Sequence, residues 1–320
     1  YMALRGSGQG LYVGLSDEAY VIASEPYGLV EATDSYLRLN GETLPNRNDS
    51  VSGNGEIVSV SLNQPVAVQS LKRIAYDGTA LPITDNEFTQ AEITTRDIDR
   101  RNFPHFLLKE IFESPQSFEK TLRGNLLNEN GSFRVAHSET EFPNSIREKL
   151  ENHTIDKIYI VGQGTAAVAG QALSQYLSEE TEISVESIPS TELSGFKLST
   201  DMSNVLVVAI SQSGTTTDTN RTVDLVRGRG ASVIAIVNRR NSDLSQKADG
   251  VIYTSDGRDI EMSVASTKAF YSQVAASILL GISIRDHAIS EPNDSLTHEN
   301  RQTFLHELNE LPAKMVTVLK

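Results

Sequence analysis

The sequence predicts an α/β fold, a parallel five-stranded sheet flanked by helices and preceded by a mainly antiparallel β segment. Two observations predict it. From residue 157 onward, short apolar runs alternate with helix-like stretches of roughly 10 to 15 residues, which is the pattern of βαβ units. Before residue 90, short β-rich runs are instead separated by turn residues, as in antiparallel sheets.

The first β-rich runs are "LYVGLS", "AYVIASEP", "SYLRLNGE", "GEIVSVSL" and "VAVQSLKRIAYDG". Dipeptides of the Asn-Gly and Asp-Gly type separate them, and these favour tight turns between antiparallel strands. The polar stretch "NRNDSVSGNG" at 46–55 is typical of an exposed loop.

The rhythm changes to helix over 103–127, where apolar and charged residues are mixed. "ESPQ" predicts a break there, with Ser114 capping a second helix that has Pro115 at its first position. We expect "NLLNENGSFRV" to be irregular and "FPNSIREKLENH" to be another helix.

Five runs then read as strands: "KIYIVGQG", "EISVESI", "NVLVVAISQSG", "ASVIAIVN" and "GVIYTS". "VLVVAI" and "SVIAIV" are almost wholly apolar, which indicates strands covered on both faces. The stretch "STKAFYSQVAASILLGISI" predicts an apolar helix, and the last residues, 291–320, also read as helical.

Composition excludes several classes of protein. The 28 basic and 42 acidic residues give a net charge of −14, which repels a phosphate backbone and argues against nucleic acid. No apolar run reaches the roughly 20 residues that cross a bilayer. The absence of cysteine excludes disulfides, thiolate-bound zinc and a thiol nucleophile, and is compatible with a cytoplasmic location. Because the chain opens at Tyr1 directly before a strand-like run, we expect a piece of a longer polypeptide.

The first glycine-rich loop, "VGQGTAA", admits two interpretations. Gly162, Gly164 and Ala167 satisfy the G-x-G-x-x-G/A dinucleotide pattern between a strand and a helix, and Glu182 and Glu186 lie near the expected ribose-binding acid. An NAD-dependent oxidoreductase is therefore one hypothesis. The other is that the glycines only make a tight turn between strand and helix.

The second loop, "ISQSGTTTDT", favours a phosphate monoester. It follows the third parallel strand, opens a helix and carries the hydroxyls of Ser211, Ser213, Thr215, Thr216 and Thr217. Hydroxyls and free N–H groups at a helix N-terminus bind phosphate oxygens without a cation. The loop lacks the lysine that a nucleotide-binding P-loop requires. The alternative is a cluster that only caps the helix.

A third segment, "EMSVASTKAF", follows the fifth strand. Ser266 and Thr267 are candidates to cap the apolar helix and to direct further N–H groups at the same crevice. Lys268 reads as a surface lysine. We expect structural roles for the histidines, which are His105, His137, His153, His287, His298 and His306.

"GQGT", "ISQSGTTTDT" and "VASTKAF", in this order and spacing, resemble the first sugar isomerase (SIS) domain of the glutamine–fructose-6-phosphate aminotransferase (isomerising) family. "PHFLLKEIFESPQSFEKTLRG" resembles the family's linker, and "ALRGSGQGLYVGLSDEAYVIASEP" the end of its glutaminase domain, an Ntn-hydrolase fold. The resemblance implies a glutaminase-like segment over 1–100, a helical linker over 101–145 and the first SIS domain over 146–290. Residues 291–320 would lead into a second SIS domain.

The resemblance also implies which residues bind the sugar phosphate. Gly164 and Thr165 would contact it from the first loop, and Val264 and Ser266 would line the sugar. The residues that the resemblance implies bind the phosphate are Ser211, Gln212, Ser213 and Thr216. Ala166 stands where the family commonly has serine, and Thr215 replaces a usual glutamate.

By this resemblance the chain is the phosphosugar-binding part of a cytoplasmic amidotransferase that converts fructose 6-phosphate and glutamine into glucosamine 6-phosphate and glutamate. We expect fructose 6-phosphate or glucose 6-phosphate as ligand and a homodimer, with no cofactor, no metal, no nucleic acid and no membrane. No residue of this chain is assigned as catalytic, because the family's cysteine nucleophile is absent and its isomerase acid and base lie in the second SIS domain and tail. The alternative is a non-catalytic SIS module for phosphosugar sensing or dimerisation.

Overall fold

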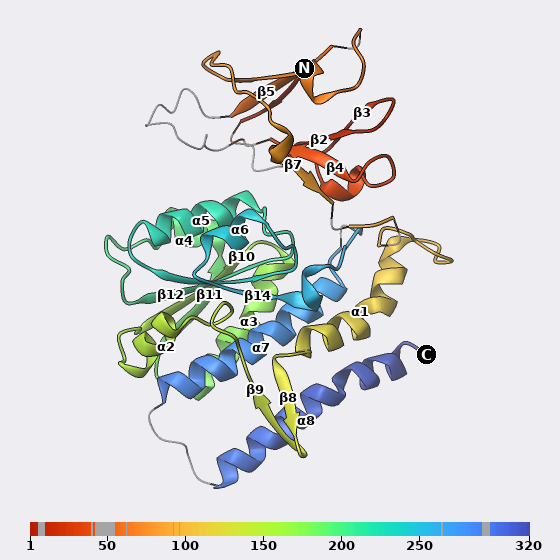
Figure 1. Ribbon diagram of the computed structural model, residues 1–320. Helices are drawn as coiled ribbons and strands as arrows, with labels where there is room; N and C mark the ends of the chain where they lie inside the picture. The colour runs from red at the N-terminus through yellow and green to blue at the C-terminus, as the bar shows by residue number, and fades with distance from the viewer. Residues whose placement is uncertain are drawn as a thin grey trace. The chain divides into compact units, whose positions relative to one another are not determined.

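The computed structural model describes residues 1–5, 10–39, 41, 55–61, 63–91, 93–95, 97–263, 265–289 and 295–320, with the backbone only for 295–298 (Figure 1). The described chain divides into two compact units, 1–99 and 100–320. In the part described, no helix is long and apolar enough to cross a membrane.

The first unit is antiparallel, as the sequence predicts. One sheet has the order β3-β2-β4-β7, and a second has the order β1-β5-β6. Their apolar faces share one core, centred on Leu4, Val13, Leu37 and Val58. Of the loop expected at 46–55, all but Gly55 lies outside the described residues. The strands are β1 (Met2–Leu4), β2 (Tyr12–Leu15), β3 (Tyr20–Ala23), β4 (Ser35–Arg38), β5 (Glu56–Val60), β6 (Leu71–Ala75) and β7 (Phe88–Gln90).

The second unit is built on a five-stranded sheet in which every neighbouring pair is parallel. This confirms the predicted fold class. The strand order is β11-β10-β12-β13-β14, so β12 lies at the centre. The strands are β10 (Lys157–Gly162), β11 (Ser184–Pro189), β12 (Val205–Ser211), β13 (Ser232–Val237) and β14 (Gly250–Tyr253).

Both faces of this sheet are covered by helices, which explains its apolar strands. Alternate residues of β12 point to opposite faces. Leu206 and Val208 pack with α2 (Asn144–Glu151), α3 (Thr165–Glu180) and α7 (Lys268–Ala288). Val207 and Ala209 pack on the other face, with helices α4 (Ser190–Phe196), α5 (Thr217–Arg227) and α6 (Asp243–Lys247). Figure 1 shows these three helices together on that side of the sheet. All seven residues of β12 are buried.

Two expectations for residues 103–135 are wrong. Helix α1 runs unbroken over Phe106–Leu122 with Pro115 inside it, and His105 rather than Ser114 provides its cap. The Ser114 hydroxyl instead donates to the Glu110 carbonyl oxygen at 3.0 Å. Packing of Phe118 and Leu122 against α7 outweighs the hydrogen bond that a proline removes from the helix.

The stretch expected to be irregular is a β-hairpin of β8 (Leu126–Glu129) and β9 (Ser132–Val135). Asn130 and Gly131 both have positive φ, 57° and 92°, which a type I′ turn requires. The Asn-Gly dipeptide was therefore the sequence signal for this hairpin. Helix α8 covers Ser295–Val318, in agreement with the predicted terminal helix.

Candidate functional site

The sheet topology marks one edge as the place for a ligand. Because β10 is flanked by β11 on one side and β12 on the other, the connections that follow β10 and β12 diverge to opposite faces of the sheet. Ligands of open parallel sheets bind at such a switch point, beyond the carboxyl ends of the strands. The first loop, residues 162–165, and the second loop, residues 211–216, both begin there.

The first loop brings α3 very close to β10. A Cβ on Gly162 would lie 2.9 Å from the backbone nitrogen of Ala167, so this position requires glycine for packing. Gly164 has φ of 56°, and its surroundings are open. Thr165, the first residue of α3, is exposed. The Gln163 amide donates to the Asp218 carboxylate at 3.5 Å and so links the first loop to the first turn of α5, directly after the second loop.

The hydroxyls of the second loop divide into two kinds. Ser211 is 3% exposed, and its Oγ accepts the Gly214 N–H at 3.0 Å, so this hydroxyl shapes the loop. Ser213 is half-buried and accepts from the Thr215 amide at 3.2 Å, which leaves its own proton to donate. Thr216 is the N-cap residue of α5, yet its side chain makes no capping bond; its Oγ1 lies 3.1 Å from Ser211 Oγ.

Backbone carbonyls anchor the second loop to the protein. The Gln212 carbonyl oxygen accepts the Asn238 N–H at 3.1 Å, and the Gly214 carbonyl oxygen accepts the Leu244 N–H at 3.0 Å and the Asn220 amide at 3.1 Å. The first amides of α5 have no acceptor within their helix. The carbonyl groups of the loop thus hold it to the rest of the domain, while the N-terminus of α5 can bind an anion.

The third segment differs from the expectation. Thr267 is the N-cap residue of α7 but makes no capping bond with its own side chain. The Glu261 carboxylate takes that role: its Oε1 accepts the Thr267 N–H at 2.6 Å and the Ala269 N–H at 3.3 Å. Its Oε2 accepts the Ser266 hydroxyl proton at 3.0 Å. These N–H groups are therefore occupied and do not point into the crevice; Val264 lies outside the described residues.

The second loop and the third segment are nonetheless connected. The Gln212 side-chain amide donates to the Asp259 carbonyl oxygen at 3.4 Å. The residues proposed from the sequence that the structure places in these two neighbouring loops are Gly164, Thr165, Ser211, Gln212, Ser213 and Thr216. Ser266 lies on the same segment as Asp259, between β14 and α7.

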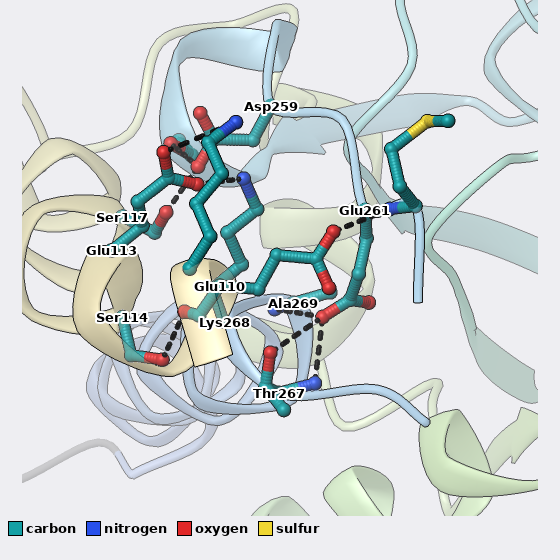
Figure 2. Close-up of polar contacts among 12 residues, drawn as sticks. Glu110, Glu113, Ser114, Ser117, Asp259, Glu261, Thr267, Lys268 and Ala269 are labelled. Carbon is teal, nitrogen blue, oxygen red and sulfur yellow. Dashed lines mark hydrogen bonds and ion pairs between the residues drawn. The ribbon is translucent and has the colours of Figure 1, made fainter. Parts of the chain in front are cut away.

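A network of charged residues beside this segment was missed by the sequence reading (Figure 2). Lys268 is 5% exposed rather than on the surface, and its Nζ lies 2.8 Å from Glu113 Oε2. Glu113 also pairs with Lys109 at 3.4 Å. Nothing in the local pattern distinguishes these residues from solvated charges, except that Lys268 opens an apolar helix.

Asp259 belongs to the same network. Burial raises the pKa of its carboxyl, but the charge of Lys268, hydrogen bonds from Ser117 and Ser255 and the charge of Lys120 outweigh this and hold the pKa below its usual value. The carboxylate is therefore ionised at neutral pH and keeps the segment attached to α1.

The dinucleotide hypothesis finds little support in this geometry. Glu182 precedes β11 and so lies at the opposite end of the sheet from the loops. Glu186 is in the middle of β11, where hydrogen bonds with Lys197 and the charges of Lys197 and Lys157, against some burial, lower its pKa. Neither acid stands where a ribose would be held. Among the described residues there is also no group of three potential metal ligands.

A protein-family model describes residues 153–283 as a SIS domain. The chain is 28% identical over 310 residues to glutamine–fructose-6-phosphate aminotransferase [isomerizing] of Bacteroides thetaiotaomicron, covering 97% of this chain and 45% of that protein. It is 35% identical over 223 residues to the enzyme of the same name from Corynebacterium efficiens, covering 69% of this chain and 33% of that protein. The chain thus spans less than half the length of these relatives.

Among solved structures, the fold is similar to the C-terminal domain of glucosamine-fructose-6-phosphate aminotransferase from Francisella tularensis. The TM-score is 0.56 with 23% identity, over 67% of this chain and 56% of that one. This likeness shows the fold of the second unit.

Proposed function

The chain is a SIS-domain homologue of the glutamine–fructose-6-phosphate aminotransferases, and from this we propose that it forms the phosphosugar-binding part of such an enzyme. The whole reaction would convert fructose 6-phosphate and glutamine into glucosamine 6-phosphate and glutamate. The observation that carries the proposal is the pairing of the first and second loops at the switch point of the sheet.

In this proposal the phosphate lies against the N-terminus of α5. The hydroxyls of Ser213 and Thr216 donate to its oxygens, and the first amides of the helix add further donors. Gly164 leaves open space for the ligand, since among the described residues, apart from its neighbours in the chain, no heavy atom lies within 4 Å of a Cβ built there. Neutral donors suit a phosphate that serves as a handle while bonds change elsewhere on the sugar.

The similarity to the Bacteroides enzyme covers 97% of the chain and so includes the antiparallel unit. This supports an amidotransferase part over a stand-alone sensing or dimerisation module. We propose that residues 1–100 are the end of a glutaminase-like domain, 101–145 a linker, 146–290 the first SIS domain and 291–320 a helical lead toward a second one. A cytoplasmic homodimer is part of the same proposal.

Calorimetric titration of fructose 6-phosphate into the chain tests the proposal. Ser213→Ala should weaken binding by about tenfold to a hundredfold, because a hydrogen bond to an ionised group contributes roughly 1.5–3 kcal/mol. Ser245→Ala, which removes a hydroxyl on α6 that donates to the Ser242 carbonyl oxygen, is the matched control. Equal affinity of wild type and Ser213→Ala would mean that the hydroxyl cluster only shapes the loop. Titration of NAD⁺ should give no binding.

A further inference from the structure

Ser266 lies on the segment between β14 and α7, residues 254–267. Helix α1, which lies outside the residues matched by the SIS model, contacts this segment at several points. Near the C-terminal end of α1, Thr121 Oγ1 accepts the Ser255 N–H at 2.9 Å. Ser117 bonds the Asp259 carboxylate one turn earlier, and Glu113 pairs with Lys268. The segment therefore runs beside α1, as Figure 2 shows.

The contact of Glu110 is the most specific of these. Its side chain is buried, with the residue 1% exposed. Oε1 accepts the Met262 N–H at 2.5 Å, Oε2 accepts the Ser263 N–H at 3.2 Å, and the Ser263 hydroxyl donates to the same carboxylate. All three donors belong to two consecutive residues, Met262 and Ser263.

A buried carboxylate is costly unless donors satisfy it, so this arrangement strongly favours one position of residues 262 and 263. Glu261 precedes them directly. Its carboxylate in turn receives the hydroxyl proton of Ser266 at 3.0 Å and the Thr267 N–H at 2.6 Å. Glu261 thus accepts the Ser266 hydroxyl proton, and Glu110 fixes the two residues that directly follow Glu261.

We propose that Glu110 is a positioning residue of the sugar site: from the linker helix it holds residues 261–263 so that Ser266 faces the sugar. This inference rests on the proposed function. It assigns to α1 a part in sugar recognition that the SIS domain alone would lack. The hydroxyls of Ser213 and Thr216, which bind the phosphate in the proposed function, have their side-chain hydrogen-bond partners within the second loop.

The variant Glu110→Gln tests this with little change in size. A glutamine can still accept one N–H, but its NH₂ group would face the other donor. We expect two results: faster hydrogen exchange of the Met262 and Ser263 amides, and about tenfold weaker binding of fructose 6-phosphate. Inorganic phosphate, used as a probe of the second loop alone, should bind as in wild type. Glu119→Gln, at an exposed position of the same helix, is the matched control.

Ser263→Ala is a milder second variant, since it removes the hydroxyl but keeps both amide bonds to Glu110. It should weaken fructose 6-phosphate binding by about threefold. Unchanged exchange of the two amides in Glu110→Gln overturns the inference, as does faster exchange with unchanged sugar affinity. Equal loss of phosphate and sugar binding overturns it too, because the role would then be general stability. If the wild-type chain binds phosphate but not the sugar phosphate, the proposed function is contradicted. The hydrogen-exchange experiment still tests whether Glu110 holds residues 262 and 263.

Discussion

Ser211 Oγ and Thr216 Oγ1 lie 3.1 Å apart across the turn that joins β12 to α5. This contact turns the N-cap threonine toward the loop and away from the capping of its own helix. It also separates a structural hydroxyl, that of Ser211, from those of Ser213 and Thr216, which remain able to donate to a ligand. Replacing Ser211 should therefore mainly lower stability, whereas replacing Ser213 should mainly weaken binding.

Ser211→Ala is expected to destabilise the protein more than Ser213→Ala. Ser211 is buried, and its loss leaves the Gly214 N–H without its acceptor, which costs about 1–3 kcal/mol. Ser213 accepts from the half-buried Thr215, so its loss should cost about 1 kcal/mol or less. Urea denaturation of both variants measures the two free energies of unfolding. The reverse order would contradict this division of the hydroxyls.

Gly214→Ala should lower the free energy of unfolding by at least about 2 kcal/mol. Gly214 has φ of 65°, where a side chain costs about 1–2 kcal/mol, and a Cβ there would overlap the side chain of the buried Ser242. Gly124→Ala is the matched control, because Gly124 has φ of 83° with open space around it and so reports only the backbone term. Adding Ser242→Gly to Gly214→Ala should recover the part due to overlap. A Gly214 variant no less stable than the Gly124 variant would show that the loop can move away.

The sheet and the two loops at its carboxyl edge could be predicted from sequence because their signals are local. An apolar run such as 205–210 indicates a strand covered on both faces, and the loop after it must lie at the carboxyl edge of a parallel sheet. The parallel sheet was therefore predicted from patterns within each βα unit.

The network around α1 could not be predicted in this way, because its partners are far apart in sequence. Lys268 and Glu113 are separated by 155 positions, and each alone reads as a solvated charge. Likewise, Pro115 predicts the end of a helix locally, whereas the packing of α1 on α7 keeps the helix intact. Glu261 replaces the expected caps because its carboxylate returns to the start of α7 after a loop.

Lys268→Met should destabilise the protein by about 2 kcal/mol. The ammonium group is buried against Glu113, and its removal leaves that carboxylate with Lys109 as its partner among the described residues. A fully buried pair would cost about 3–5 kcal/mol, but Glu113 is partly exposed. Glu113→Gln in the same background should recover part of the loss, which a double-mutant cycle measures as coupling. Additive effects of the two substitutions would mean that the ion pair contributes nothing to stability.

His137 should make the free energy of unfolding depend on pH. The ring is buried, and burial, countered by the charge of Glu141 and assisted by that of Arg147, lowers its pKa from 6.5 to about 4. Nδ1 lies 2.8 Å from the Ser283 hydroxyl, while Nε2 is buried with no hydrogen-bond partner in the described part of the chain. A second proton on this ring would therefore have no acceptor.

The free energy of unfolding should consequently fall as pH is lowered from about 6.5 to about 4. In this window the unfolded chain binds a proton at residue 137 and the folded chain does not, so acid favours unfolding. A difference between 6.5 and about 4 corresponds to roughly 3 kcal/mol at the acid end. His137→Asn, which cannot take up that proton, should reduce the dependence on pH by this amount, even if it lowers stability at pH 7. Urea denaturation at several pH values measures both curves, and parallel curves would contradict a neutral buried imidazole.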